Sequence, residues 1–214
     1  MRTRAVEDVA TTPCILPQTV LLAAGLDTLA WRPSINQQEQ PLQDIYEIDL
    51  SQMFLDKFEK LASIPKTNTG KHVYIQSDLT GDNWKDKLLS NGFQMSLPTV
   101  WIMEGLLYYL TLDQTRKFFQ IIDSLSCKSS RFFFDHLKTP LTNEMLLAVK
   151  RKLLNSYMDN PKENELAWLA DKYDWNIETF LDFNHSGEHY GRKYEAYIAD
   201  GKQGGIHFVR GIKT

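Results

Sequence analysis

The chain has 214 residues, which is enough for one domain with a substantial hydrophobic core. A hydrophobic share of 43% and a charged share of 24% are ordinary for a globular protein. The net charge is −3 and the sequence holds no long basic run, so we expect no nucleic-acid partner.

Helical patterns alternate with short apolar runs along the first half of the chain, as in a sheet of buried parallel strands. Ser51 is expected to serve as the N-cap of the longest helix in this half. The expected elements are a helix over Arg2–Val9, a strand over Val20–Ala24, a helical turn over Thr28–Arg32, a strand over Ile45–Leu50, a helix over Ser51–Ala62 and a strand over His72–Gln76.

The second half continues the alternation and ends in a predicted hairpin at the sheet edge, formed by Glu195–Ala199 and Ile206–Ile212. Its other expected elements are helices over Trp84–Ser90, Leu112–Leu125, Thr142–Met158 and Ile177–Phe183, and strands over Thr99–Met103 and Arg131–Asp135. Strands that alternate with helices predict an α/β fold with a parallel, doubly wound sheet. We expect a single domain over residues 1–214 with a helical insert at about 142–189.

Four acidic residues stand at or just beyond the carboxyl ends of predicted strands: Asp27, Asp49, Asp78 and Glu104. In an open α/β sheet, ligands bind at this edge, so the sequence predicts a ligand site there. For Asp27, a purely structural role as the cap of the following helical turn is about as well supported.

An adenosine ligand suits these positions better than a metal ion or a dinucleotide. Asp49 can accept from both ribose hydroxyls and Asp78 from the adenine amino group, while Leu79 packs on the ring. Gly25 lets the backbone approach a ligand, and Glu104 is placed to meet an amine. A dinucleotide site would use G-x-G-x-x-G to hold a pyrophosphate, but this chain has A-A-G-L-D-T, which disfavours a dehydrogenase-like nucleotide binder.

The histidines and cysteines predict no metal site. His185 and His189 stand four residues apart, but Gly187 lies between them and no cysteine or acid pair completes a site. Cys14 and Cys127 are far apart in sequence, which fits a reducing compartment without a disulfide framework. No apolar run approaches the roughly 20 residues that span a bilayer, so we expect a cytoplasmic protein without a membrane partner.

Several motifs occur in order along the chain: RTRAVED at the start, LLAAGLDTLAWR, YEIDL followed by Lys57, SDL ahead of Trp84, NGF, PTVWIMEGLLYYL and, near the end, HFVRGIK. Together they resemble the leucine carboxyl methyltransferase family, and most of all its bacterial-type branch of S-adenosylmethionine-dependent methyltransferases. The likeness runs nearly end to end. Family members carry a helical region ahead of the RTR segment, and the expectation is that this chain lacks it.

The resemblance implies a class I methyltransferase (Rossmann-like) fold, whose seven-stranded sheet is mostly parallel with an antiparallel terminal strand, and S-adenosylmethionine as cofactor. It assigns Gly25 to the methionine part, Asp49 to the ribose, Asp78 and Leu79 to the adenine, Glu104 to the amino group, and Arg2 or Arg4 to the cofactor carboxylate. Asp27 lies beside this set. Where the family often has Gly-Ala-Gly at the first turn, this chain begins with Ala23.

These observations favour O-methylation of a carboxylate or hydroxyl on a small molecule. A carboxylate acceptor is already ionised and needs no general base, whereas a hydroxyl would need one, and His136 is the histidine best placed for it. The sequence identifies no catalytic residue beyond this and gives no oligomeric state. The alternative is a non-catalytic protein that binds the nucleoside, or a truncated pseudoenzyme that binds nothing because it lacks the N-terminal helical region. Methylation of a protein C-terminal leucine carboxylate is less favoured.

Overall fold

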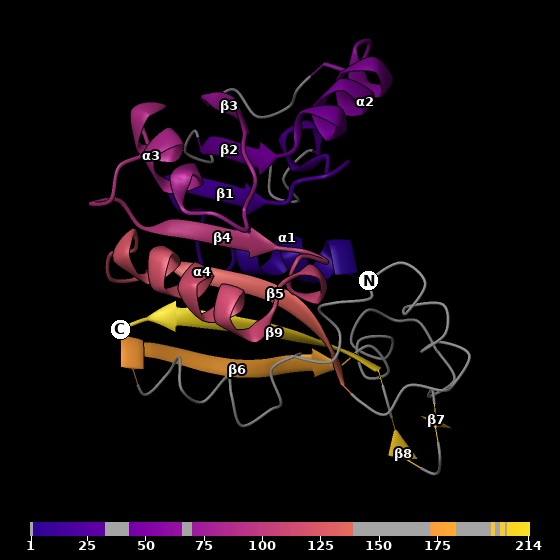
Figure 1. Ribbon diagram of the computed structural model, residues 1–214, viewed down its shortest axis with the longest axis vertical. Coiled ribbons are helices and arrows are strands. Elements are labelled where there is room, and N and C mark those ends of the chain that lie inside the picture. The colour runs from indigo at the N-terminus through magenta and orange to yellow at the C-terminus, as the bar shows by residue number, and fades with distance from the viewer. Residues whose placement is uncertain are drawn as a thin grey trace.

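The computed structural model describes residues 2–32, 43–65, 70–138, 172–182, 198–199, 202–203 and 205–214 (Figure 1). Its helices are α1 (Arg2–Thr11), η1 (Leu29–Trp31), α2 (Ser51–Leu61), α3 (Asn83–Ser90), η2 (Leu107–Tyr109) and α4 (Leu112–Ser124). Its strands are β1 (Gln18–Leu22), β2 (Asp44–Asp49), β3 (His72–Gln76), β4 (Thr99–Met103), β5 (Arg131–Lys138), β6 (Trp175–Asp182), β7 (Ile198–Ala199), β8 (Lys202–Gln203) and β9 (Gly205–Lys213).

The described strands form a seven-stranded sheet in the order β3-β2-β1-β4-β5-β9-β6. Strands β1 to β5 are parallel, whereas β9 runs antiparallel to both β5 and β6. The chain therefore turns from one half of the sheet to the other between β1 and β4, the place where open α/β sheets bind ligands. The expected doubly wound, mostly parallel sheet with an antiparallel terminal strand is confirmed.

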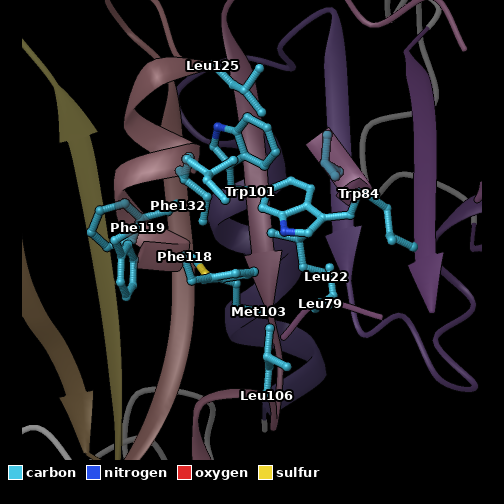
Figure 2. Packing of buried hydrophobic residues seen from close by; sticks show 14 of the residues in the cluster. Leu22, Leu79, Trp84, Trp101, Met103, Leu106, Phe118, Phe119, Leu125 and Phe132 are labelled. Carbon is cyan, nitrogen blue, oxygen red and sulfur yellow. The ribbon is translucent and has the colours of Figure 1, made fainter. Parts of the chain in front are cut away.

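Helices cover both faces of this sheet. On the face of α3 and α4, a large cluster contains Trp84, Trp101, Phe118 and Phe119, and Figure 2 shows the two phenylalanines of α4 turned toward the strands. A capping box at Thr111 begins α4. On the opposite face, a second cluster packs α1 against the strands, and α1 lies behind β4 and β5 in Figure 1.

The predicted elements of the first 135 residues are confirmed with small changes at their ends. The strands predicted over His72–Gln76 and Thr99–Met103 match β3 and β4 residue for residue. One prediction was wrong in detail: Ser51 is the first residue of α2, and the N-cap is Leu50, which makes no side-chain capping bond. The adjoining Asp49 accepts the N–H of Leu50 instead, at 2.7 Å.

The helix predicted over Ile177–Phe183 is wrong, because this part of the chain is the edge strand β6. β6 pairs with β9, and its register shifts between Thr179 and Leu181, so one extra residue, Phe180, stands in the strand. The shift breaks the period-two alternation that marks a strand. The remainder of the expected insert, 142–171 and 183–189, lies outside the described residues, as does the helix predicted over 142–158.

The predicted hairpin between Glu195–Ala199 and Ile206–Ile212 is also wrong. β7 pairs with β8 in a separate two-stranded ladder, and β9 lies between β5 and β6. Gly211 of β9 faces Phe132 of β5 so closely that a Cβ would come within 2.3 Å of the ring, which suits a glycine-bearing strand in this position. Within the described part of the chain, no helix is long and apolar enough to cross a membrane.

Candidate functional site

A cavity of about 350 Å³ opens at the carboxyl ends of β1 and β4, where the strand order changes direction. Its volume is within the range of small-molecule pockets. The lining consists of Thr3 from α1, residues 21–28 at and after the end of β1, Arg32 after η1, and Ile102 and Glu104 at the end of β4. The cavity therefore lies at the edge of the sheet where the sequence predicts a ligand.

A tight turn after β1 forms the floor of this cavity. Ala23 and Gly25 both have left-handed backbone conformations, with φ of 58° and 51°. The N–H groups of Ala23 and Ala24 donate to the carbonyl oxygen of Ile48, at 2.9 and 3.3 Å, and fix the turn to β2. Glycine adopts this conformation without steric cost, whereas alanine at position 23 is strained.

Asp49, at the end of β2, is joined to the same turn. Its Oδ2 accepts the N–H of Gly25 at 2.6 Å, and its Oδ1 accepts the N–H of Leu50. The residue is 9% exposed. A carboxylate offers about four acceptor positions, so each oxygen can accept a further hydrogen bond after these two are made. The predicted ribose acceptor is thus held rigidly beside Gly25.

Asp27 fulfils the structural role that the sequence left open. Its Oδ1 accepts the N–H of Leu29 at the start of η1, at 2.6 Å, and lies 3.4 Å from Nη2 of Arg32. Nε of Arg32 lies 3.3 Å from Glu7 of α1, so these charges join α1 to the turn. Asp27 also lines the cavity, and the two roles are compatible.

Asp78 and Leu79 follow β3 and are absent from the cavity lining. Asp78 is exposed, and its Oδ1 accepts from both the N–H and the hydroxyl of Thr80, each at 2.8 Å. These bonds hold the pKa of the Asp78 carboxyl below its usual range, first through the backbone N–H and then through the hydroxyl. Leu79 is 9% exposed and packs in the cluster of α3 and α4.

Glu104 lines the cavity from the end of β4. The next residue, Gly105, has φ of 71° and donates its N–H to Oδ1 of Asp135 at 2.6 Å. Asp135 is fully buried in β5. Sequence reasoning missed Asp135, although the rule that singled out the other acids, a carboxylate at the end of a predicted strand, applies to it as well.

Of the two expected partners of a cofactor carboxylate, Arg4 is not among the described residues that line the cavity. Arg4 pairs with acids of its own helix, Asp8 at 3.3 Å and Glu7 at 4.0 Å, and the side chain of Arg2 lies outside the described part. Among the described residues that line the cavity, the one cation is Arg32, which sequence reasoning did not select. The structure describes no group of three or more histidine, cysteine or acidic side chains that could hold a metal ion.

The sheet order and the site at its switch point define a class I methyltransferase fold. The structure superposes on a methyltransferase from Thermobifida fusca YX with a TM-score of 0.67 at 17% identity, over 99% of this chain and 78% of that one. It also superposes on an N-methyltransferase from Bradyrhizobium japonicum WM9 in complex with S-adenosyl-L-homocysteine, with a TM-score of 0.56 at 9% identity, over 99% and 85% of the two chains.

The family is narrower than the fold. The sequence model of leucine carboxyl methyltransferases matches residues 1–123, more than half of the chain, so the protein belongs to the leucine carboxyl methyltransferase family. A relative from Mycolicibacterium paratuberculosis, described as an S-adenosyl-L-methionine-dependent methyltransferase, is 35% identical over 65% of this chain and 45% of its own length. One from Mycobacteroides abscessus, described likewise, is 31% identical over 77% and 51%. The chain spans about half the length of these curated relatives.

Proposed function

We propose that this protein transfers a methyl group from S-adenosylmethionine to a carboxylate or hydroxyl oxygen of a small molecule. The observation that carries the proposal is the hydrogen bond from Gly25 to Asp49, because Gly25 lines a cavity that Asp27 and Glu104 also line, although Asp49 itself is not among the lining residues. Names of the relatives support the choice of cofactor, because they are described as S-adenosyl-L-methionine-dependent methyltransferases.

The charges of the cavity fit this cofactor better than a diphosphate. Among the residues that the structure describes, two carboxylates, Asp27 and Glu104, and one guanidinium, Arg32, line it. The cofactor carries a sulfonium and an ammonium, both cationic, besides one carboxylate. A pyrophosphate would meet carboxylates without the backbone N–H cradle of a glycine-rich loop.

Most of the proposed ligands follow from position. Asp49 would accept the ribose hydroxyls through the lone pairs that Gly25 and Leu50 leave open. Glu104 would receive the ammonium group. Asp78 would accept from the adenine amino group and Leu79 would pack on the ring. Asp78 is ionised and exposed at the end of β3, the strand next to β2 in the sheet. By the family resemblance, and not by its position in the structure, Arg2 or Arg4 remains the proposed partner of the cofactor carboxylate.

When bound, the cofactor supplies an electrophilic methyl group on a sulfonium centre. The protein's contribution is to hold the acceptor oxygen in line and to keep water out, which can recover roughly 7–11 kcal/mol of barrier for well-oriented reactants. A carboxylate acceptor is ionised at neutral pH, so no residue needs to remove a proton. A hydroxyl acceptor would call on His136, which stands in β5 opposite His207.

A second candidate substrate is a C-terminal leucine carboxylate on another protein. The description of the matched family supports it. The chemistry is the same as for a small carboxylate, so the two candidates differ only in what surrounds the acceptor.

Calorimetric titration of the 214-residue chain with S-adenosylmethionine and S-adenosylhomocysteine tests the cofactor. We expect micromolar binding and, for Asp49→Asn, a loss of about tenfold or more, the contribution of a charge-assisted hydrogen bond. Asp113→Asn, an aspartate on α4 whose side chain is 92% exposed, is the matched control and should bind normally. Absence of binding by the folded chain would refute the proposal.

A labelled-methyl assay then tests the acceptor, using a panel of small carboxylic acids, small alcohols and a peptide ending in leucine. Mild base releases label from a methyl ester but not from a methyl ether, so the assay separates the two oxygens. Label that appears only in the peptide would favour the second candidate. Label on nitrogen or sulfur acceptors alone would contradict O-methylation.

A further inference from the structure

Glu47, two residues before the proposed ribose ligand Asp49, forms a buried ion pair. Glu47 of β2 and Lys57 of α2 are both fully buried, and Nζ of Lys57 lies 2.5 Å from Oε2 of Glu47. Burial of two charges is costly, and an apolar pair of similar volume is often as stable or more so. Stability alone therefore does not explain why charges occupy this place.

The second oxygen of Glu47 extends the contacts to β3 and η1. Nε2 of His72 lies 2.8 Å from Oε1 of Glu47. The His72 ring meets the edge of Trp31 at 5.3 Å between centroids, and Nζ of Lys57 lies 5.4 Å from the centre of the same Trp31 ring. A single carboxylate thus joins β2 to α2 and β3, and its two partners, Lys57 and His72, both contact Trp31 of η1.

These joined elements carry the residues of the candidate site. Alternate residues of a strand share a face, so Glu47 and Asp49 lie on the same side of β2. Asp49 leads into α2 through Leu50, whose N–H its carboxylate accepts. The ion pair closes a ring of chain from residue 47 to residue 57 with Asp49 inside it. Glu47 and Lys57 are both fully buried and already paired with each other, so neither is placed to touch a ligand.

We propose that Glu47 and Lys57 are positioning residues, which fix α2 against β2 so that the Asp49 carboxylate recognises the 2′- and 3′-hydroxyls of a ribose. The inference rests on the proposed function, in which Asp49 is the ribose ligand. The bond between Lys57 and Glu47 fixes the position of α2 relative to β2. The position of α2 fixes the Leu50 N–H that precedes it, and this N–H orients the Asp49 carboxylate.

The test measures how well the full chain distinguishes S-adenosylhomocysteine from its 2′-deoxy analogue. A general structural defect weakens both ligands alike, whereas a misplaced Asp49 weakens S-adenosylhomocysteine more, because the 2′-deoxy analogue offers Asp49 only the 3′-hydroxyl. We expect wild-type protein to prefer S-adenosylhomocysteine by about tenfold or more, the worth of one charge-assisted hydrogen bond. The ratio of the two affinities in Asp49→Asn is the reference value for a protein that no longer recognises the ribose hydroxyls.

Two variants address the pair itself. Lys57→Met leaves Glu47 buried and unpaired, and the double variant Glu47→Leu with Lys57→Met replaces the pair by apolar groups and protects folding if the single variant fails. In both we expect the ratio to fall toward that of Asp49→Asn. Lys213→Met is the matched control, because Lys213 forms a largely buried pair with Asp123 at the end of β9; we expect it to lower the melting temperature and leave the ratio unchanged.

The outcomes separate the two proposals. A folded double variant that keeps the wild-type ratio, while Asp49→Asn loses it, overturns the positioning role and leaves the proposed function standing. A wild-type chain that binds neither ligand overturns both proposals. An Asp49→Asn protein with an unchanged ratio overturns the positioning role together with Asp49 as the ribose ligand, and leaves the proposed methyl transfer standing.

Discussion

Arg131 is the residue whose removal should most weaken the attachment of α1. It is 6% exposed, and its Nη1 donates to the carbonyl oxygens of Thr12 at 2.7 Å, Cys14 at 2.9 Å and Val9 at 3.4 Å. Carbonyls at the end of a helix have no partner within the helix, so the guanidinium satisfies groups that burial would otherwise leave unpaired. α1 contributes Val6 and Val9 to the second core cluster and Thr3 to the cavity.

The magnitude for Arg131→Met follows from these bonds. Hydrogen bonds to a charged group contribute about 1.5–3 kcal/mol each, but the three share one cation and part of the loss is recovered by water, so we expect a loss of about 3 kcal/mol. For a domain of this size, that is a fall of about 6–12 °C in melting temperature. Urea unfolding followed by circular dichroism would measure the free energy of unfolding.

Arg116→Met is the matched control, since Arg116 is half exposed and its pairing with the exposed Asp113 is worth at most about 0.5 kcal/mol. Arg131→Lys should recover part of the loss, because one ammonium cannot reach all three carbonyls. A loss for Arg131→Met no larger than that of Arg116→Met would refute the reasoning.

Three further predictions concern single positions. Ala23→Gly removes a left-handed alanine and should raise the free energy of unfolding by about 0.5–1 kcal/mol, which thermal melts would detect. Gly211→Ala drives a Cβ into the Phe132 ring and should cost about 1–3 kcal/mol in urea unfolding; a neutral effect would contradict the close approach. Thr80→Val removes one of the bonds that lower the pKa of Asp78, so an NMR titration should show that pKa rise toward its ordinary value. A lowered pKa stabilises the folded protein at pH values above the unfolded pKa, near 3.9, and this stabilisation is lost as the pH falls through the folded pKa. In the Thr80→Val variant the folded pKa is higher, so the stabilisation should be smaller and should disappear at a higher pH.

The parallel half of the sheet could be predicted because each strand is a short apolar run between turn residues. β3 and β4 match their predicted bounds for this reason. The edge strand β6 could not be predicted, since Ile177, Phe180 and Leu181 recur at helical spacing. The register shift near Phe180 also removes the alternation of apolar and polar residues that marks a strand. Pairing with β9 decided the structure of this segment, and a local pattern carries no information on such a distant partner.

The candidate site divides in the same way. The sequence shows which residues stand at the end of a predicted strand, so Asp49 and Glu104 could be predicted as site residues. It does not show whether a charged side chain is buried in the protein. Nothing local indicates that Glu47 and Lys57 bury their charges against each other. Likewise, nothing local in the sequence indicates that Arg32 lines the cavity with its guanidinium beside both Asp27 and Glu7.

The acids at the strand ends share a property that bears on every test of the site. Asp49 accepts the N–H of Gly25, Asp27 that of Leu29, Asp78 that of Thr80 and Asp135 that of Gly105. Asp27 and Asp78 are therefore oriented by their own loops, and Asp49 and Asp135 by the loop that follows a neighbouring strand. A ligand would meet acceptors that are already in place, which lowers the entropy lost on binding. Truncation to alanine would release the loop as well as the ligand. Asparagine keeps one acceptor oxygen and removes the charge, so only a loss that persists in the asparagine variant of a folded protein can be assigned to recognition.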